Sequence, residues 1–493
     1  MMDYRRLPRS IPEEQGIPSA AIRAWLNEVQ RSGLELHSFM LLRHGRVVSE
    51  GWWAPYKPEQ PHMIFSLNKI FTSTAVGIAI SEGRFALDDK VADFFPEYDR
   101  NRLDKRKASL TVRHLLTMSA GQEKPAMGVN FRRMNTSWVE HFLGLPIDHD
   151  PGTRFVYNGG ASHMLAVIVQ KAAGQTLREY LQPRLFGPLG IEGARWEIDP
   201  SGYNCGGFGL IVKTEDIAKL GQLYLQKGRW NGKAILTEDW VQQATSLQIS
   251  NGDRPGHADA QMGYGYQFWL CRHGAYRGDG AHGQLCVVMP RQDAVLAVTA
   301  GDNRTGVLLD LVWEHLLPHM ADEALPEDRL TQEELAGMLS GLRHAPPDFS
   351  AETGTASNVS VRISGKRFMM EENPFHIQAV SFEFEDRGCT FTLWDRKGMH
   401  RVVCGDGVYA EGETTVVCKD LHHECQLPVM KVAASGAWRG GAAYVMTWRF
   451  PETPFCDTLV CNFEGNSVII VHTVNVNNGP HERPPIRGHA EAG

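Results

Sequence analysis

The order of strand-like and helix-like segments along the first 320 residues restricts the fold more than any other feature. Two apolar stretches, residues 39–42 and 47–48, flank the turn sequence Arg43-His44-Gly45-Arg46, which predicts a hairpin. Helix-like segments follow between residues 66 and 225, and two more strands are predicted around Pro290. Strands at both ends with helices between them predict an α+β fold. We expect a helical lobe inserted between parts of one sheet.

The pattern changes at about residue 356, where apolar and polar residues begin to alternate. Val380, Phe382 and Phe384 are separated by single polar residues, which is typical of half-buried strands. The preceding residues 321–355 are polar and rich in turn formers, and the residues from Gly479 are rich in proline and charge. We therefore predict an α+β domain over 1–320, a linker over 321–355, a small all-β domain over 356–478 and a loose tail over 479–493.

Composition argues against several classes of partner. The net charge is -7 and the sequence pI is about 6.3, without a basic stripe, so neither nucleic acid nor anionic lipid is an expected ligand. The longest apolar stretch, near residues 76–80, is too short to span a bilayer, and the charged N-terminus lacks the apolar segment of a signal peptide. The nine cysteines are odd in number and show no disulfide framework, which favours a reduced, cytoplasmic protein.

The tetrapeptide Ser66-Leu67-Asn68-Lys69 opens a helix that is apolar almost all round. Residues three apart lie on one face of the first helical turn, so the side chains of Ser66 and Lys69 can meet. Burial of this helix would desolvate Lys69 and lower its pKa, which would make it a base for the Ser66 hydroxyl. The alternative is structural, with a capping serine and a lysine whose amine reaches solvent.

A second candidate segment, residues 150–160, is rich in turn formers and opens another helix. Tyr157 within it could reach Ser66 and shuttle a proton to a leaving group. The alternative is a half-buried tyrosine whose hydroxyl bonds to the main chain. This segment alone favours the structural reading.

Taken together, these features resemble the superfamily of class C β-lactamases, penicillin-binding proteins and related esterases. Six blocks in family order carry the resemblance over roughly residues 10–318: 65–69, 87–91, 115–121, 151–158, 185–191 and 207–210. The resemblance implies a β-lactamase/transpeptidase-like fold, which is an antiparallel sheet flanked by helices plus a helical lobe, with its site in the cleft between sheet and lobe. It implies Ser66 as nucleophile, Lys69 as base and Tyr157 as proton relay, with neither metal nor organic cofactor.

The sequence departs from the family pattern in two places. The family's second motif is Tyr-x-Asn or Tyr-x-Ser, whereas here its third position is Gly159 and Asn158 comes one residue early. The third motif, usually Lys-Thr-Gly or His-x-Gly, has no clean match near residues 276–284. Candidate substrate-binding groups are therefore Asn158, Arg277, the backbone N–H near Gly278, and His282.

These residues predict hydrolysis of a small-molecule ester or amide through an acyl-enzyme on Ser66. The missing Lys-Thr-Gly favours the esterase, amidase and 6-aminohexanoate-oligomer hydrolase branches of the superfamily. A weak β-lactamase or D-peptidase, or a penicillin-binding sensor without turnover, is the alternative. Oligomeric state is left open, and a homo-oligomer is compatible with the sequence.

One group of metal-binding residue types lies in the C-terminal region. Cys418, His422, His423 and Cys425 occur within eight residues, but their spacing matches no zinc motif. We therefore predict no metal site from the sequence.

Overall fold

The computed structural model of the chain describes residues 6–98, 104–126, 132–252, 256–349, 356–416, 418–425 and 427–491. The chain divides into two compact units. The first unit comprises Met1–Trp52 with Pro58–Leu342, and the second comprises Trp53–Lys57 with Arg343–Gly493. Residues 350–355 of the predicted linker and 492–493 of the predicted tail lie outside the described residues.

The first unit is built on a six-stranded antiparallel sheet in the order β2-β1-β11-β10-β9-β8. Its strands are β1 (Leu36–Arg43), β2 (Arg46–Trp52), β8 (Trp269–Leu270), β9 (Tyr276–Gly280), β10 (Gln284–Met289) and β11 (Ala294–Ala300). His44 and Gly45 both have positive φ angles, as a tight two-residue hairpin turn requires, and so join β1 to β2. The sheet therefore combines strands from both ends of the first unit.

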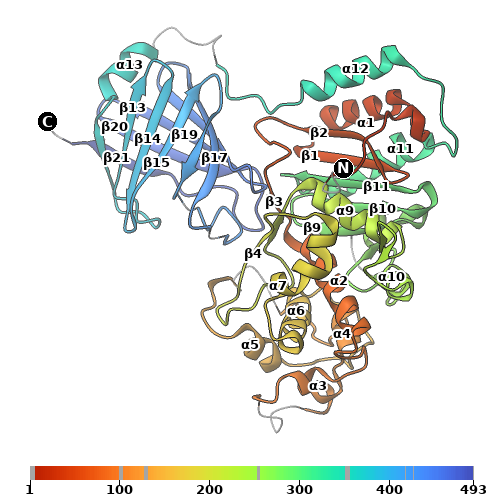
Figure 1. Cartoon of the computed structure of the whole chain (residues 1–493). Coiled ribbons are helices and arrows are strands. Elements are labelled where there is room, and N and C mark those ends of the chain that lie inside the picture. Colours follow the sequence, from red (N-terminus) through yellow and green to blue (C-terminus); the bar gives the residue numbers. More distant parts are fainter. Residues whose placement is uncertain are drawn as a thin grey trace. The chain divides into compact units, whose positions relative to one another are not determined.

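Helices cover this sheet on both faces, and every residue of β1 is buried. Helix α9 (Thr214–Leu225) packs on β1, β10 and β11, while α1 (Ser19–Arg31) packs with α11 (Thr305–His315) and α12 (Arg329–Ser340). Figure 1 shows α1 and α11 on one side of the sheet and α9 on the other. Helix α12 falls in the region predicted as linker, yet it packs on α1 and β2 and so belongs to the first unit.

The helical lobe lies between β2 and β8 in sequence. Its two longest helices, α2 (Asn68–Ser81) and α6 (Gly159–Ala173), pack directly on each other and are buried along almost their whole length. Side-chain caps at Thr111, Asn158 and Thr176 fix where three of the helices begin. The other helices are α3 (Lys105–Ser109), α4 (Val112–Leu116), α5 (Trp138–Gly144), α7 (Leu177–Leu181), α8 (Gly187–Leu189) and α10 (Glu238–Ala244).

Short strands complete the first unit. Strands β3 (His62–Met63), β5 (Leu210–Val212) and β4 (Arg195–Trp196) form a three-stranded antiparallel sheet. Strands β6 (Arg229–Trp230) and β7 (Lys233–Ala234) form a separate pair. Strand β3 directly precedes the turn that carries Ser66, so this small sheet helps to fix the start of α2.

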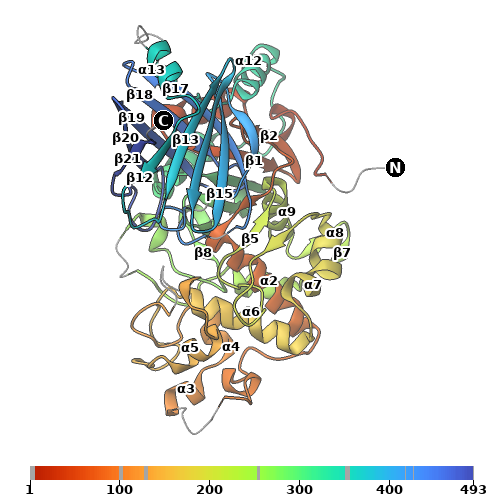
Figure 2. The same ribbon diagram turned by 90° about the vertical axis from the view of Figure 1, so that its left-hand side faces the viewer.

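The second unit is a ten-stranded sheet in the order β15-β14-β13-β12-β21-β20-β19-β18-β17-β16, preceded by helix α13 (Ala356–Ile363). Its strands (Figure 2) are β12 (Arg367–Met370), β13 (Ala379–Glu385), β14 (Gly388–Asp395), β15 (Gly398–Asp406), β16 (Ala410–Thr414), β17 (Met430–Arg439), β18 (Ala443–Arg449), β19 (Cys456–Glu464), β20 (Ser467–Val474) and β21 (Ile486–Ala490). A parallel pairing of β15 with β17 joins the two ends, so the sheet closes on itself. The outline predicted from sequence, an α+β fold with a C-terminal all-β region, is confirmed.

Two parts of the second unit differ from the sequence-based division. The predicted loose tail contains β21, which pairs with β12 and β20 because its alternation of buried and exposed residues suits a sheet. The short segment Trp53–Lys57 also belongs to this unit: Ala54 forms a bridge with Arg343, and its carbonyl accepts a hydrogen bond from the His344 N–H at 2.9 Å. The predicted boundaries at 320, 355 and 478 otherwise stay a prediction.

Among the helices in the described ranges, none combines the length and the apolar character that a membrane-crossing helix requires.

Candidate active site

The nucleophile candidate and its base candidate are in direct contact. Ser66 lies in the 3-10 turn Phe65–Leu67 (η2), and Lys69 lies in the first turn of α2. Nζ of Lys69 donates a hydrogen bond to Oγ of Ser66 at 2.8 Å. Ser66 is partly exposed, whereas Lys69 is buried, so the hydroxyl can meet a ligand while the amine stays out of solvent.

The residue before Ser66 has a strained backbone. Phe65 has a φ of 46°, a left-handed conformation that costs on the order of 1–3 kcal/mol for a residue with a bulky side chain. Its buried ring packs edge-on against the ring of His282, with 5.2 Å between the centroids. This packing holds the chain in the turn from which the Ser66 hydroxyl projects beside Lys69.

His282 is thus placed as a support for Phe65. It is buried, and its Nδ1 lies 2.8 Å from Oδ1 of Asn303. The imidazole thus contacts Phe65 and Asn303 inside the protein, and its predicted contact with substrate stays a prediction. The sequence placed His282 in the correct turn but could not give the direction of its side chain.

Lys69 lies in an environment that favours its neutral form. Burial lowers the pKa of Lys69 from its ordinary value of 10.5 to about 7, although the negative charge of Asp279 acts in the opposite direction. A second hydrogen bond runs from Nζ to the carbonyl oxygen of Gly207 at 2.8 Å. About half of the molecules near neutral pH therefore carry an uncharged amine that can accept a proton.

The carbonyl that binds Lys69 belongs to a glycine-rich segment, residues 205–209, that passes between α2 and α6. A Cβ on Gly206 would lie 2.1 Å from the carbonyl oxygen of Ser162, and one on Gly207 would lie 2.9 Å from that of Gly159. Asn68 and Thr72 donate hydrogen bonds to the Gly206 carbonyl at 2.7 and 2.8 Å. Only a chain without side chains here fits the gap, and it presents the Gly207 carbonyl to Lys69.

Tyr157 lies over the amine of Lys69. Nζ is 4.8 Å from the centroid of the Tyr157 ring, and this ring packs against Trp269 with 5.2 Å between centroids. Tyr157 is partly exposed and lines an open pocket. The structure thus places Tyr157 beside Lys69, which contacts Ser66, while the role of Tyr157 as a proton relay stays a prediction.

Asn158 has a structural position. It is buried, and it caps α6: its Oδ1 accepts hydrogen bonds from the N–H groups of Gly160 at 2.9 Å and Ala126 at 3.1 Å, while its Nδ2 donates to Gln122. This corrects the predicted substrate contact, because the amide is used inside the protein. The one-residue displacement from the family motif thus places the amide in the helix cap.

Strand β9 lies against the turn that carries Ser66. A Cβ on Gly278 would lie 2.5 Å from Cδ1 of Leu67, and one on Gly280 would lie 3.0 Å from the backbone nitrogen of Leu67. Both positions therefore require glycine if β9 is to approach η2 this closely. The predicted proximity of Gly278 to the site agrees with this packing, while its role toward an oxyanion stays a prediction.

Arg277 is engaged within the protein. It is buried, its Nε donates to Oδ2 of Asp279 at 2.9 Å, and its Nη1 donates to the carbonyl of Asp259 at 2.9 Å and to Sγ of Cys271 at 3.1 Å. This corrects the prediction that Arg277 offers a free positive group to substrate. Asp279, which the sequence reading missed, is the partly exposed charged group of β9 and affects the pKa of Lys69.

A pocket of about 560 Å³ opens beside Tyr157. Its described lining is Pro125, Thr153, Arg154, Phe155, Val156, Tyr157, Ser250 and Asn251. The lining mixes apolar side chains with hydroxyl, amide and guanidinium groups, which suits a small organic ligand.

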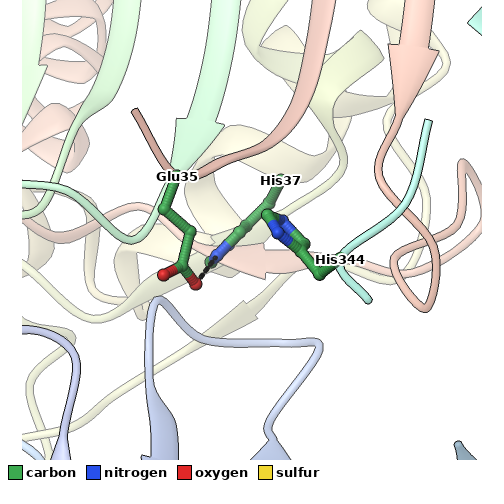
Figure 3. Close-up of side chains that lie close together, drawn as sticks. All are labelled: Glu35, His37 and His344. Carbon is green, nitrogen blue, oxygen red and sulfur yellow. Dashed lines mark hydrogen bonds and ion pairs between the residues drawn. The ribbon is translucent and has the colours of Figure 1, made fainter. Parts of the chain in front are cut away.

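Other groups of histidine and acidic residues in the first unit are explained by their neighbours. Glu35 contacts Nε2 of His37 at 3.4 Å (Figure 3), and Nδ1 of His37 lies 3.0 Å from Nε2 of His62. Asp259 and Asp310 both form ion pairs with Arg272, at 2.8 and 2.5 Å. These are hydrogen-bonded and ion-paired networks, so we place no metal in them.

An antiparallel sheet with a helical lobe, and a Ser-x-x-Lys pair at the start of the lobe's buried helix, define a serine hydrolase of the β-lactamase and penicillin-binding-protein superfamily. The sequence matches the family described as Beta-lactamase over residues 5–318, and the chain belongs to this family.

Among curated relatives, the 6-aminohexanoate-dimer hydrolase of Paenarthrobacter ureafaciens is 25% identical over 306 residues, which is 56% of this chain and 77% of the relative. The lovastatin esterase of Penicillium rubens is 25% identical over 168 residues, 30% of this chain and 42% of that protein. The matched region therefore spans less than half of the lovastatin esterase. The solved structure of SurE with D-Leu superposes with a TM-score of 0.50 at 17% identity, covering 88% of this chain and 97% of that one, which shows a shared fold.

Proposed function

We propose that the protein hydrolyses small esters or amides through an acyl-enzyme on Ser66. The contact of 2.8 Å between a partly exposed Ser66 hydroxyl and the buried amine of Lys69 carries the proposal. A lysine whose pKa is lowered to about 7 can take the hydroxyl proton near neutral pH, which an ordinary lysine cannot do. The hydrolase names of the two curated relatives support the reaction class.

In the proposed reaction, Oγ of Ser66 attacks the substrate carbonyl carbon and its proton moves to Nζ of Lys69. Backbone N–H groups, including that of Ser66, stabilise the negative oxygen of the tetrahedral intermediate. The bond to the leaving group then breaks, and the proton passes from Lys69 through the Tyr157 hydroxyl to the departing alcohol or amine. Water attacks the acyl-enzyme in the same way, which releases the acid and restores the Ser66 hydroxyl.

The charges around the site favour neutral ester substrates over β-lactams. β-Lactam antibiotics carry a carboxylate, whereas the cation on β9, Arg277, is neutralised by Asp279 at 2.9 Å. Arg277 is therefore already paired and offers a substrate carboxylate no uncompensated positive charge. We therefore propose esterase or amidase activity ahead of β-lactamase activity.

The test compares kcat/KM for short p-nitrophenyl esters with that for nitrocefin, using the Ser66→Ala protein as the background. We expect ester hydrolysis to be faster and to require Ser66. Asp279→Asn is the matched variant, and it should raise the relative rate on nitrocefin because it leaves the positive charge of Arg277 unbalanced. Faster nitrocefin turnover by the unmodified protein would contradict the proposal, and a single burst without turnover would favour the sensor alternative.

The cytoplasmic location and a homo-oligomeric state stay predictions. Light scattering on the purified protein and fractionation of the source cells test them.

A further inference from the structure

Four side chains of metal-binding type converge inside the second unit. Nε2 of His422 lies 2.7 Å from Oδ1 of Asp457, and Nε2 of His472 lies 2.8 Å from Oδ2 of the same carboxylate. Sγ of Cys418 lies 4.0 Å from Nε2 of His472, and donor atoms of Cys418, His422 and Asp457 all lie within 4.8 Å of one another. One thiol, one imidazole and one carboxylate thus face a common point, and the second imidazole contacts the other oxygen of the carboxylate.

The sheet register places two of these residues together. Asp457 pairs with Val474 across β19 and β20, and Leu459 pairs with His472. Asp457 and His472 are therefore diagonal neighbours on one face of the two strands. That face is the buried one, so both side chains point into the interior of the closed sheet.

The other two residues come from the loop between β16 and β17. The N–H of His422 donates to the carbonyl of Cys418 at 2.8 Å, a bond spanning four residues that brings both side chains to one side of the turn. The loop is anchored beside them, because Asp420 forms an ion pair with Arg483 at 2.5 Å and its carbonyl accepts a hydrogen bond from Asn477. The site thus joins a loop to the strands that it crosses.

The surroundings are apolar and closed. The ring of His422 stacks on Phe455 with 4.5 Å between centroids and meets Phe450 edge-on at 5.0 Å. Cys418, His422 and Asp457 have no exposed surface. The two imidazoles give the buried Asp457 carboxylate hydrogen bonds, but the buried thiol of Cys418 beside them distinguishes this cluster from the histidine–carboxylate networks of the first unit.

We propose that Cys418, His422 and Asp457 bind a zinc-class divalent cation that fixes this loop to β19, with His472 holding the second oxygen of the Asp457 carboxylate. One sulfur, one nitrogen and one oxygen are donors that zinc accepts, and two positive charges balance a thiolate and a carboxylate. The three ligands are completely buried, so the site is structural and separate from the Ser66 chemistry. Oxygen and nitrogen donors around tetrahedral zinc lie about 3.4 Å apart, so binding requires the imidazole of His422 to move back from Asp457 by about half an ångström.

The spacing of residues in the sequence does not predict this metal site. Of the four residues in the sequence cluster, Cys418 and His422 face the common point, whereas the third ligand, Asp457, and its partner His472 come from strands more than 30 residues further along the chain. Only the pairing of β19 with β20 brings them together.

The test loads the purified full chain, stripped with a chelator, with Co²⁺ and then with Zn²⁺. We expect one equivalent of Co²⁺ to bind and to give the near-ultraviolet charge-transfer band of a thiolate ligand, and Zn²⁺ to displace it and raise the melting temperature. Cys418→Ser should lose the band, and Asp457→Asn should weaken binding at least tenfold. Cys425→Ser, a buried thiol of the same loop, is the matched control and should keep both.

A wild-type chain that hydrolyses its ester substrate yet binds no stoichiometric Co²⁺ or Zn²⁺ would overturn the proposal, as would a thiolate band that survives in Cys418→Ser. Metal bound without a thiolate band would place it elsewhere and would equally overturn it. The wild-type titration decides the matter even where a variant fails to fold. Ester hydrolysis reports on Ser66 alone, so failure of the metal proposal is distinguishable from failure of the proposed function.

Discussion

Replacing Lys69 by methionine and by arginine tests whether this lysine acts as a general base or has only a structural role. The change in the pKa of Lys69 from 10.5 to about 7 corresponds to a bias of about 5 kcal/mol against its charged form. At pH 7 about half of the molecules are neutral at Lys69, compared with roughly one in 3,000 for an ordinary lysine. Neither methionine nor the permanently charged arginine can accept the Ser66 proton, so kcat should fall by about 10²–10⁴ in both variants.

The burial of Lys69 also predicts that the two variants change the stability of the protein in opposite directions. Because the pKa of Lys69 is lower in the folded chain, the unfolded chain binds more protons between pH 7 and 10.5, so the free energy of unfolding rises with pH across that window. Below about pH 7 the full penalty, about 5 kcal/mol at most, opposes folding. Lys69→Met removes this penalty and should melt at a higher temperature at pH 7, whereas Lys69→Arg keeps a buried charge and should melt lower.

The assay is p-nitrophenyl ester hydrolysis from pH 5 to 9, beside thermal melts of the three proteins. The wild-type rate should rise with pH through an apparent pKa of about 7 and then level off, because the neutral amine is the active form. A stable Lys69→Arg protein with near-normal turnover would refute the general-base role. A wild-type profile that is flat from pH 5 to 9 would refute the lowered pKa.

Two further variants test the surroundings of this pair. Tyr157→Phe keeps the ring packing on Trp269 but lacks the hydroxyl, so kcat should fall by about 10² or more while the melting temperature stays close to wild type; unchanged kcat would remove Tyr157 from the proton path. Gly278→Ala places a Cβ 2.5 Å from Leu67, so it should cost roughly 1–3 kcal/mol of stability and lower ester turnover by displacing η2. Gly337→Ala in α12 is the control, because the added atom meets nothing within 4 Å, and it should do neither. Equal behaviour of the two variants in melts and kinetics would contradict the packing argument.

The fold was predictable wherever local patterns decide it. The hairpin at residues 43–46 follows from turn residues between two apolar stretches, and the alternation around residues 380–384 identified the C-terminal strands. Long-range pairing was not predictable. Strand β21 follows three prolines and looks like a tail, and its place becomes evident only once β12 and β20 are paired on either side of it.

The candidate site also has a part that local sequence predicts and a part that it does not. Ser66 and Lys69 meet because three residues of a helical turn set their distance, which the sequence states directly. Arg277, His282 and Asn158 were chosen by residue type, but residue type does not show which way a side chain points, and all three are used inside the protein. Asp279 was missed because the sequence does not show that this carboxylate, two residues after Arg277, lies close enough to Lys69 to affect its pKa.

The segment Trp53–Lys57 is synthesised early, but it belongs to the second unit, which is synthesised last. Its partner Arg343 follows Ala54 by about 290 residues, which at a synthesis rate of about 5–20 residues per second means roughly 15–60 s of translation. Throughout that interval the first unit is being completed around a segment whose hydrogen-bond partners have not yet been made. During synthesis, therefore, these five residues stay without their later partner. A chain that stalls on the ribosome before residue 343 would expose them to proteases and chaperones.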